Sequence, residues 1–212
     1  PATAIYEHIQ EHYRNDCTPL VAKRNAVICS QGTELPGLHL VEEGEILLAR
    51  FSPDGRETLI SILGPGDFFG ESSLLSGTEV TFSATATKRS RLLLLPRRKF
   101  RLLLEDPWLC RNLLERIAHQ CNDAWIQLEV LGCTRVRDKV LSGLAWLSGK
   151  IGVKTHDGVR IDINQTQLAR MVGCAREALS REVSELRRMR ALDVRYGNGK
   201  TSLVLVHPRN RE

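Results

Sequence analysis

The side chains with the most specific chemistry lie near the C-terminus, in a short stretch holding Arg176, Glu177, Ser180 and Arg181. At these spacings they share one face of an α-helix. A guanidinium can donate two hydrogen bonds to guanine and a carboxylate can accept one from cytosine, each worth roughly 1–3 kcal/mol of discrimination. The stretch therefore indicates contact with the bases of a duplex. The alternative is a solvated helix face with an intrahelical ion pair such as Arg181–Glu185.

Two helices around a glycine turn are predicted to position this stretch. Asn164 and Gln167 have the spacing of a capping box, which predicts the start of a short helix. Gly173 suits a tight turn, and Ala175–Met189 carries apolar residues at helical spacing opposite the polar face. Ala169 is small enough for the two helices to cross closely. The pattern is typical of a helix-turn-helix.

A hairpin is expected after the second helix, because segments 192–196 and 201–206 read as strands around a glycine-rich turn. Lys200 at this turn is expected to contact a phosphate, which adds affinity without sequence preference. The same role is predicted for four arginines: Arg187, Arg188, Arg190 and Arg195.

The net charge differs in sign between the first 134 residues and the rest of the chain. Residues 1–134 have a net charge of −3, whereas residues 135–212 have a net charge of +8. A basic C-terminal third on an acidic chain indicates a polyanionic partner, most simply nucleic acid, with a solvated basic surface as the alternative.

Short strand-like segments fill residues 20–95, separated by turn residues such as Pro53-Asp54-Gly55. This spacing predicts an antiparallel β-sandwich or barrel. The segment 64–75 departs from this pattern of strands and turns. Its glycines precede Glu71, which lies at the start of a predicted short helical turn. Such a loop can approach an anionic ligand closely, although a simple turn is the alternative.

A long helix is predicted over residues 106–132, with Asp106 as its cap. Apolar and small residues recur along it at alternating spacings of four and three, which is a coiled-coil seam. We expect this seam to join two copies of the chain; the alternative is an apolar face buried within one subunit. Leu113, Trp125 and Ile126 lie off the seam and are expected to pack on the β-domain. The predicted interface residues are Leu114, Ile117, Cys121, Ala124, Leu128 and Leu131.

Length and composition exclude several classes of protein. The chain has 212 residues, of which 42% are hydrophobic, and contains no apolar run of the length that spans a bilayer. The six cysteines lack the spacing of a zinc site. We expect a cytoplasmic protein with reduced thiols, no membrane association and no bound metal.

Two motifs resemble the CRP/FNR family, the cyclic-AMP receptor and fumarate-nitrate regulator group of bacterial transcription factors. They are Gly64-x-Gly66-Asp67-Phe68-Phe69-Gly70-Glu71 and Val172-Gly173-Cys174-Ala175-Arg176-Glu177. The resemblance implies an α+β fold with an effector-sensing β-sandwich at 1–105, a dimerisation helix at 106–132 and a winged helix-turn-helix at 133–212. It implies a homodimeric regulator and not an enzyme.

The resemblance also implies which residues read DNA. Arg176, Glu177 and Arg181 match the base-reading residues of the cyclic-AMP receptor branch, and Glu177, Ser180 and Arg181 match those of the fumarate-nitrate branch. The expected target is a palindrome with TGTGA-like or TTGAT-like half-sites, and Arg176 favours the first. Ala175 departs from the usual serine, which would cap the helix.

The effector pocket departs more from the family pattern. Val80 and Thr81 align with the Arg-Ser pair that holds a cyclic phosphate, and Ala124 and Trp125 align with the Thr-Ser pair that meets adenine. Without the arginine a buried phosphate loses a charge-assisted partner, so the resemblance argues against cyclic AMP as the effector. The candidate pocket residues are Gly70, Glu71, Ser72, Thr81, Ala124 and Trp125.

Other readings of the effector stay open, and the cofactor is unknown. A haem sensor would need an axial ligand from among Pro1, His8, His12, His39, Cys110 and His119. Cys174 is expected to be an inert thiol, with a redox switch as the alternative. A cupin-like metal enzyme using His39 and Glu43 is the remaining alternative. The expected partners are double-stranded DNA, a second copy of the chain and, for an activator, RNA polymerase.

Overall fold

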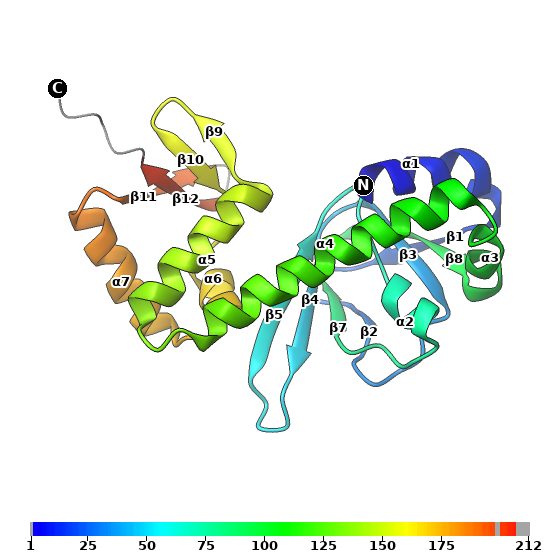
Figure 1. The fold of residues 1–212 in the computed structure, drawn as a ribbon, viewed down its shortest axis with the longest axis horizontal. Helices are drawn as coiled ribbons and strands as arrows, with labels where there is room; N and C mark the ends of the chain where they lie inside the picture. Colours follow the sequence, from blue (N-terminus) through cyan, green and yellow to red (C-terminus); the bar gives the residue numbers. More distant parts are fainter. Residues whose placement is uncertain (1, 198–199, 207–212) are drawn as a thin grey trace. The chain divides into compact units, whose positions relative to one another are not determined.

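The computed structural model describes residues 2–197 and 200–206, so Pro1, Asn198 and Gly199 lie outside the described residues (Figure 1). The chain divides into two compact units, Pro1–Cys121 and Asn122–Glu212. The boundary falls inside one long helix, α4 (Pro107–Gly132), so each unit contains part of that helix.

The first unit contains two antiparallel four-stranded sheets, which confirms the predicted mixed α+β fold with a β-sandwich. The first sheet has the order β1 (Thr18–Ala22), β8 (Ser90–Pro96), β3 (Gly37–Glu43), β6 (Phe68–Phe69). The second has the order β2 (Val27–Cys29), β7 (Ser83–Ala86), β4 (Ile46–Phe51), β5 (Glu57–Leu63).

Successive side chains of a strand point to opposite faces of the sheet, so the apolar residues of the first sheet contribute to two separate cores. Val41 and Leu92 of the first sheet meet Ile46 and Ala84 of the second sheet in the space between the sheets. The opposite face of the first sheet packs against helices. These helices are α1 (Ala2–Tyr13), α3 (Arg97–Leu103) and the beginning of α4; η1 (Arg14–Asp16) follows α1 (Figure 1).

The predicted turns form where expected. Gly55 adopts a φ of 79° in the turn between β4 and β5. Gly70 adopts a φ of 104° immediately before α2 (Glu71–Ser76), and a Cβ there would lie 2.8 Å from a methyl of Leu35. Glycine at position 70 therefore allows the loop to pack closely and to place Glu71 at the first position of α2.

Helix α4 begins at the predicted cap, because Oδ1 of Asp106 accepts a hydrogen bond from the backbone N–H of Trp108 at 2.9 Å. Leu113 is buried, as predicted. Trp125 and Ile126, which were expected to pack on the β-domain, are 68% and 40% exposed. Both belong to the second unit, which begins at Asn122, so their packing on the β-domain stays a prediction.

The second unit contains the predicted helix-turn-helix and hairpin, together with a strand pair that sequence analysis missed. Helix α5 (Val136–Ile151) precedes β9 (Val153–Thr155) and β10 (Gly158–Ile161). Helices α6 (Gln165–Val172) and α7 (Arg176–Arg188) follow, then β11 (Leu192–Gly197) and β12 (Lys200–Val206). The four strands form one antiparallel sheet in the order β11-β12-β10-β9.

Candidate DNA interface and effector site

The capping box predicted for α6 is present. The backbone N–H of Gln167 donates to Oδ1 of Asn164 at 2.9 Å, and the backbone N–H of Asn164 donates to Oε1 of Gln167 at 3.1 Å. Gly173 ends α6 with a φ of 65°, and Ala169 is buried. Ala175 precedes α7 without a side-chain cap. These contacts fix where α7 begins.

Helix α7 separates its residues into an apolar face and a polar face. Leu179, Val183 and Leu186 are buried in the unit. Arg176, Glu177 and Arg181 are exposed, and Ser180 is half-buried. All four therefore lie away from the buried face of the helix.

The alternative ion pair between Arg181 and Glu185 does not form. The carboxylate of Glu185 instead accepts a hydrogen bond from Arg188, three residues later. Within the part of the chain that the structure describes, Arg176, Glu177 and Arg181 have no ion-pair partner. These three charges are therefore not neutralised by the fold.

One ion pair that sequence analysis missed anchors α7 to α5. Nε of Arg137 donates to Oε1 of Glu182 at 2.6 Å, and the Glu182 side chain is only 19% exposed. Glu182 directly follows Arg181 in the sequence. The pair therefore restrains the rotation of α7 about its own axis.

Three of the arginines expected to contact phosphates form ion pairs with carboxylates. Arg188 pairs with Glu185, and Arg187 lies 3.9 Å from Asp193. Arg195 pairs with Asp157, and the pKa of Asp157 is lowered by the Thr155 hydroxyl and by the Arg195 guanidinium. Arg190 is exposed, and the Lys200 side chain lies outside the described part of the structure.

In the sandwich unit, Glu71 is a buried carboxylate whose partners come from α4. The exposed fraction of Glu71 is 2%. Its Oε1 accepts hydrogen bonds from Nε of Arg116 at 3.2 Å and from Nε2 of Gln120 at 2.6 Å. Arg116 also donates to the carbonyl oxygen of Phe68 at 2.9 Å and lies 4.1 Å above the Phe68 ring. The charge of Glu71 is thus balanced within the unit.

The other candidate pocket residues differ from Glu71 in burial or in the unit to which they belong. Ser72 and Thr81 are exposed, whereas Gly70 is buried in the turn before α2. Val80 is 1% exposed and packs in the core between the sheets. Ala124 and Trp125 are exposed and belong to the second unit, so the structure does not place them relative to Glu71.

Of the histidines considered as metal or haem ligands, His8 and His12 lie side by side, with ring centroids 4.6 Å apart. His39 is buried between the sheets, and burial lowers its pKa to about 4. His8 lies 3.0 Å from a carboxylate oxygen of Asp106 and stacks on Trp108. His119 is exposed. Within the described ranges, no cluster of three or more His, Cys, Asp or Glu residues is arranged to hold a metal ion.

The cysteines are free thiols. Cys174, next to the start of α7, is half-buried, and burial raises its pKa. None of the helices in the described part combines the length and apolar character that a bilayer crossing requires.

Two known domain families match most of the chain. Residues 19–106 match the family described as a cyclic nucleotide-binding domain, and residues 139–209 match the Crp-like helix-turn-helix domain. The first match covers the β-sandwich and the second covers α6, α7 and their sheet.

The chain is similar to characterised relatives over most of their length. The chain is 32% identical to the cyclic AMP receptor protein of Thermus thermophilus over 157 residues, covering 74% of this chain and 70% of the relative. It is 28% identical to the CRP-like cAMP-activated global transcriptional regulator of Mycobacterium tuberculosis over 170 residues, covering 79% and 76%. A solved CRP/FNR-family regulator from Thermus thermophilus aligns with a TM-score of 0.64 and 27% identity, covering 88% of this chain and 93% of that one.

Proposed function

Because the chain belongs to the CRP/FNR family of transcription regulators, we propose that it acts as a homodimer on palindromic DNA with TGTGA-like or TTGAT-like half-sites. The observation that carries this proposal is the polar face of α7. Arg176, Glu177 and Arg181 are exposed and have no ion-pair partner in the described chain, so they are available to base edges. The relatives named above are a transcriptional regulator and a cyclic AMP receptor protein, which argues against the cupin-like alternative.

Dimerisation by α4 is supported by the exposure of its seam. Leu114 and Leu128 are 68% and 60% exposed, Cys121 and Ala124 are exposed, and Ile117 and Leu131 are half-buried. An apolar row of this length on one helix is rarely left in water, and a second copy of the same helix would cover it. Two recognition helices would then enter successive major grooves about 34 Å apart.

In this proposal, residues 1–105 sense a signal, residues 106–132 join the two subunits, and residues 133–212 bind DNA. DNA as the partner implies action in the cytoplasm. RNA polymerase is a further partner if the protein activates transcription.

We do not propose cyclic AMP as an effector of this protein. The carboxylate of Glu71 is already engaged by Arg116 and Gln120, and the buried Val80 side chain cannot neutralise a phosphate. An anion placed beside Glu71 would add a negative charge to a buried site, which is costly without a new cation. A different small molecule, or no effector, is consistent with this arrangement.

A gel-shift titration tests the proposal. The probe is a duplex with TGTGA and TCACA separated by six base pairs, and the controls are a TTGAT-type palindrome and a scrambled duplex. We expect the purified protein to bind one palindrome more tightly than the scrambled duplex, with a mobility that corresponds to two protein chains. Equal affinity for all three duplexes, with and without cell extract, would contradict the proposal.

Cyclic AMP is the second arm of the same experiment. We expect no change in affinity when it is added. Strong stimulation would refute the statement about the effector but would leave the DNA-binding function intact. A visible spectrum with a Soret band would instead identify a haem sensor.

A further inference from the structure

The final part of α4, residues 122–132, belongs to the same compact unit as the helix-turn-helix. This segment contains three of the proposed seam residues, Ala124, Leu128 and Leu131. On the proposed function, one short piece of helix therefore contacts the partner subunit and also supports α5, α6 and α7. Whatever fixes α5 on this segment also fixes the DNA-reading helix relative to the dimer axis.

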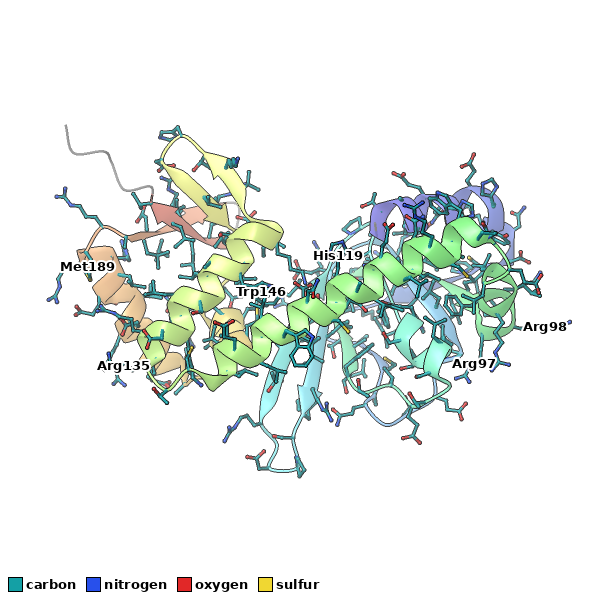
Figure 2. The ribbon with its side chains drawn as sticks, in the orientation of Figure 1. Arg97, Arg98, His119, Arg135, Trp146 and Met189 are labelled. Atoms are coloured by element: carbon teal, nitrogen blue, oxygen red, sulfur yellow. The ribbon has the colours of Figure 1, made fainter. Side chains whose placement is uncertain are left out.

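Asp123 holds α5 at one end of the segment. Its Oδ1 accepts a hydrogen bond from Nε1 of Trp146 at 3.0 Å, and its Oδ2 pairs with the ammonium group of Lys150. Nζ of Lys150 also lies 5.1 Å from the centre of the Trp146 ring. Figure 2 shows Trp146 on α5, where its side chain is directed toward α4. Two donors one helical turn apart thus use both oxygens of one carboxylate.

A second contact holds α5 further along the segment. Val130 is 2% exposed, and its Cγ1 lies 3.9 Å from the place where a Cβ on Gly143 would be. The same Cβ would lie 2.5 Å from a methyl of Val172, so glycine at 143 permits the close approach of α6. Val130 lies about 10 Å along the helix from Asp123, at 1.5 Å per residue.

The two contacts differ in burial. Val130 is buried, whereas Asp123 and Trp146 are half-buried. Apolar packing on α5 is therefore denser at Val130 than at Asp123, where the polar contacts hold the helix. Without the polar contacts of Asp123, α5 would be able to pivot about the Val130 contact.

We propose that Asp123, through Trp146 and Lys150, is a positioning residue that sets the distance between DNA half-sites accepted by the dimer. Rotation of α5 would be transmitted to α7 by the ion pair between Arg137 and Glu182. Asp123 would touch no DNA. Its contribution would be to spacing and not to the reading of bases, and the inference rests on the dimeric DNA-binding function proposed above.

The inference is tested by measuring how affinity depends on the number of base pairs between the two half-sites. The probes are duplexes in which TGTGA and TCACA are separated by four, six or eight base pairs. A change of two base pairs rotates one half-site by about 70° relative to the other, because one turn holds about 10.5 base pairs. For the wild-type chain we expect one spacer to be preferred at least about tenfold, which corresponds to about 1.4 kcal/mol.

For Asp123→Ala we expect this preference to fall to less than about threefold, with unchanged discrimination against a base change inside a half-site. Trp146→Phe keeps the ring but removes the N–H donor, so it should lower the preference in the same direction. Because it is a mild substitution, it also tests the inference if Asp123→Ala fails to fold. Glu129→Ala removes an exposed acid from the same segment and should behave as wild type.

Equal loss of affinity at all three spacers in Asp123→Ala and Trp146→Phe would show a purely structural role and overturn the inference. A wild-type preference retained by both variants would overturn it as well. A wild-type chain that binds none of the palindromes tested would instead overturn the proposed function, and this inference with it.

Discussion

Glu71 and Arg116 form a buried ion pair across 45 residues of sequence, with Nε of Arg116 3.2 Å from Oε1 of Glu71. The two side chains are 3% and 14% exposed. The pair joins the first residue of α2 to α4 and lies at the position where the family resemblance places an effector. A charge that the fold neutralises itself does not require a ligand to neutralise it.

Removing the cation of this pair should be costly for stability. Arg116→Met leaves the Glu71 carboxylate buried without a counter-charge, and breaking a buried pair typically costs about 3–5 kcal/mol. We expect a loss near the lower end of this range, because Gln120 still donates to Glu71. The free energy of unfolding from urea titrations is the measurement.

The matched control for this variant is Arg111→Met. Arg111 lies on the same helix and pairs with Glu115 at the surface, where an ion pair contributes less than about 0.5 kcal/mol. The double variant Glu71→Gln with Arg116→Met should recover part of the lost stability. If Arg116→Met and Arg111→Met had equal effects, the importance assigned to the buried pair would be wrong.

His39 should make the stability of the protein depend on pH. It lies in the core between the sheets, where its ring stacks on Phe69 with centroids 4.8 Å apart. Burial lowers its pKa from 6.5 to about 4, and a hydrogen bond with the Gly37 backbone opposes this shift. The unfolded chain therefore binds a proton more readily than the folded chain between pH 6.5 and pH 4.

The sign follows from this difference in proton binding. The stabilising contribution of neutral His39 is complete above about pH 6.5 and is lost as the pH falls toward 4. We expect about 2 kcal/mol of loss between pH 7 and pH 5 from this residue alone. His39→Phe, which keeps the stacking and cannot titrate, should remove that part of the pH dependence, whereas His119→Gln at an exposed site should not. If the free energy of unfolding of His39→Phe depended on pH as strongly as that of the wild type, other groups would be the cause.

Much of the fold was predictable because local signals determine it. The turn at 53–55 and the capping box of Asn164 and Gln167 depend on residues close in the sequence, and both formed as predicted. Helix α4 also begins at its predicted cap. In these places the backbone geometry and the nearest side chains are sufficient.

Other features depend on distant residues, and the sequence did not reveal them. Arg116 and Gln120 read as exposed helix residues until the fold brings them to Glu71. Trp125 was expected to pack on the β-domain because it lies off the seam, yet it belongs to the second unit, where it is 68% exposed. The strands β9 and β10 are short, at three and four residues, and gave no clear alternating pattern.

Two arginines of α7 should differ in how their substitution affects DNA binding, one through base discrimination and the other through overall affinity. Arg181→Ala removes an exposed, unpaired guanidinium, so it should lower discrimination at one base pair per half-site by about 1–3 kcal/mol. Arg188→Ala removes a side chain that is paired with Glu185, and it should change affinity only slightly and equally for every sequence. Binding to duplexes with single base changes is the measurement. Equal losses on specific and random DNA in Arg181→Ala would contradict the role assigned to Arg181.

Cys121 offers a chemical test of the seam on α4. The residue is exposed and occupies a seam position between Ile117 and Ala124. In a symmetric dimer joined by this seam, the thiol would lie opposite the thiol of the partner subunit. Diamide, which accepts the two electrons and two protons released when two thiols form a disulfide, should therefore convert the protein to a covalent dimer on a non-reducing gel.

The cysteine variants decide which thiol forms the bond. Cys121→Ser should abolish the covalent dimer. Cys17→Ser should not, because Cys17 is half-buried in the sandwich unit and burial raises its pKa to about 11, leaving little reactive thiolate. Dilution should slow the reaction less than expected for random collision if the dimer already exists. A covalent dimer that persists in Cys121→Ser, or none in the wild-type protein, would show that the exposed row from Leu114 to Leu131 is not the contact between subunits.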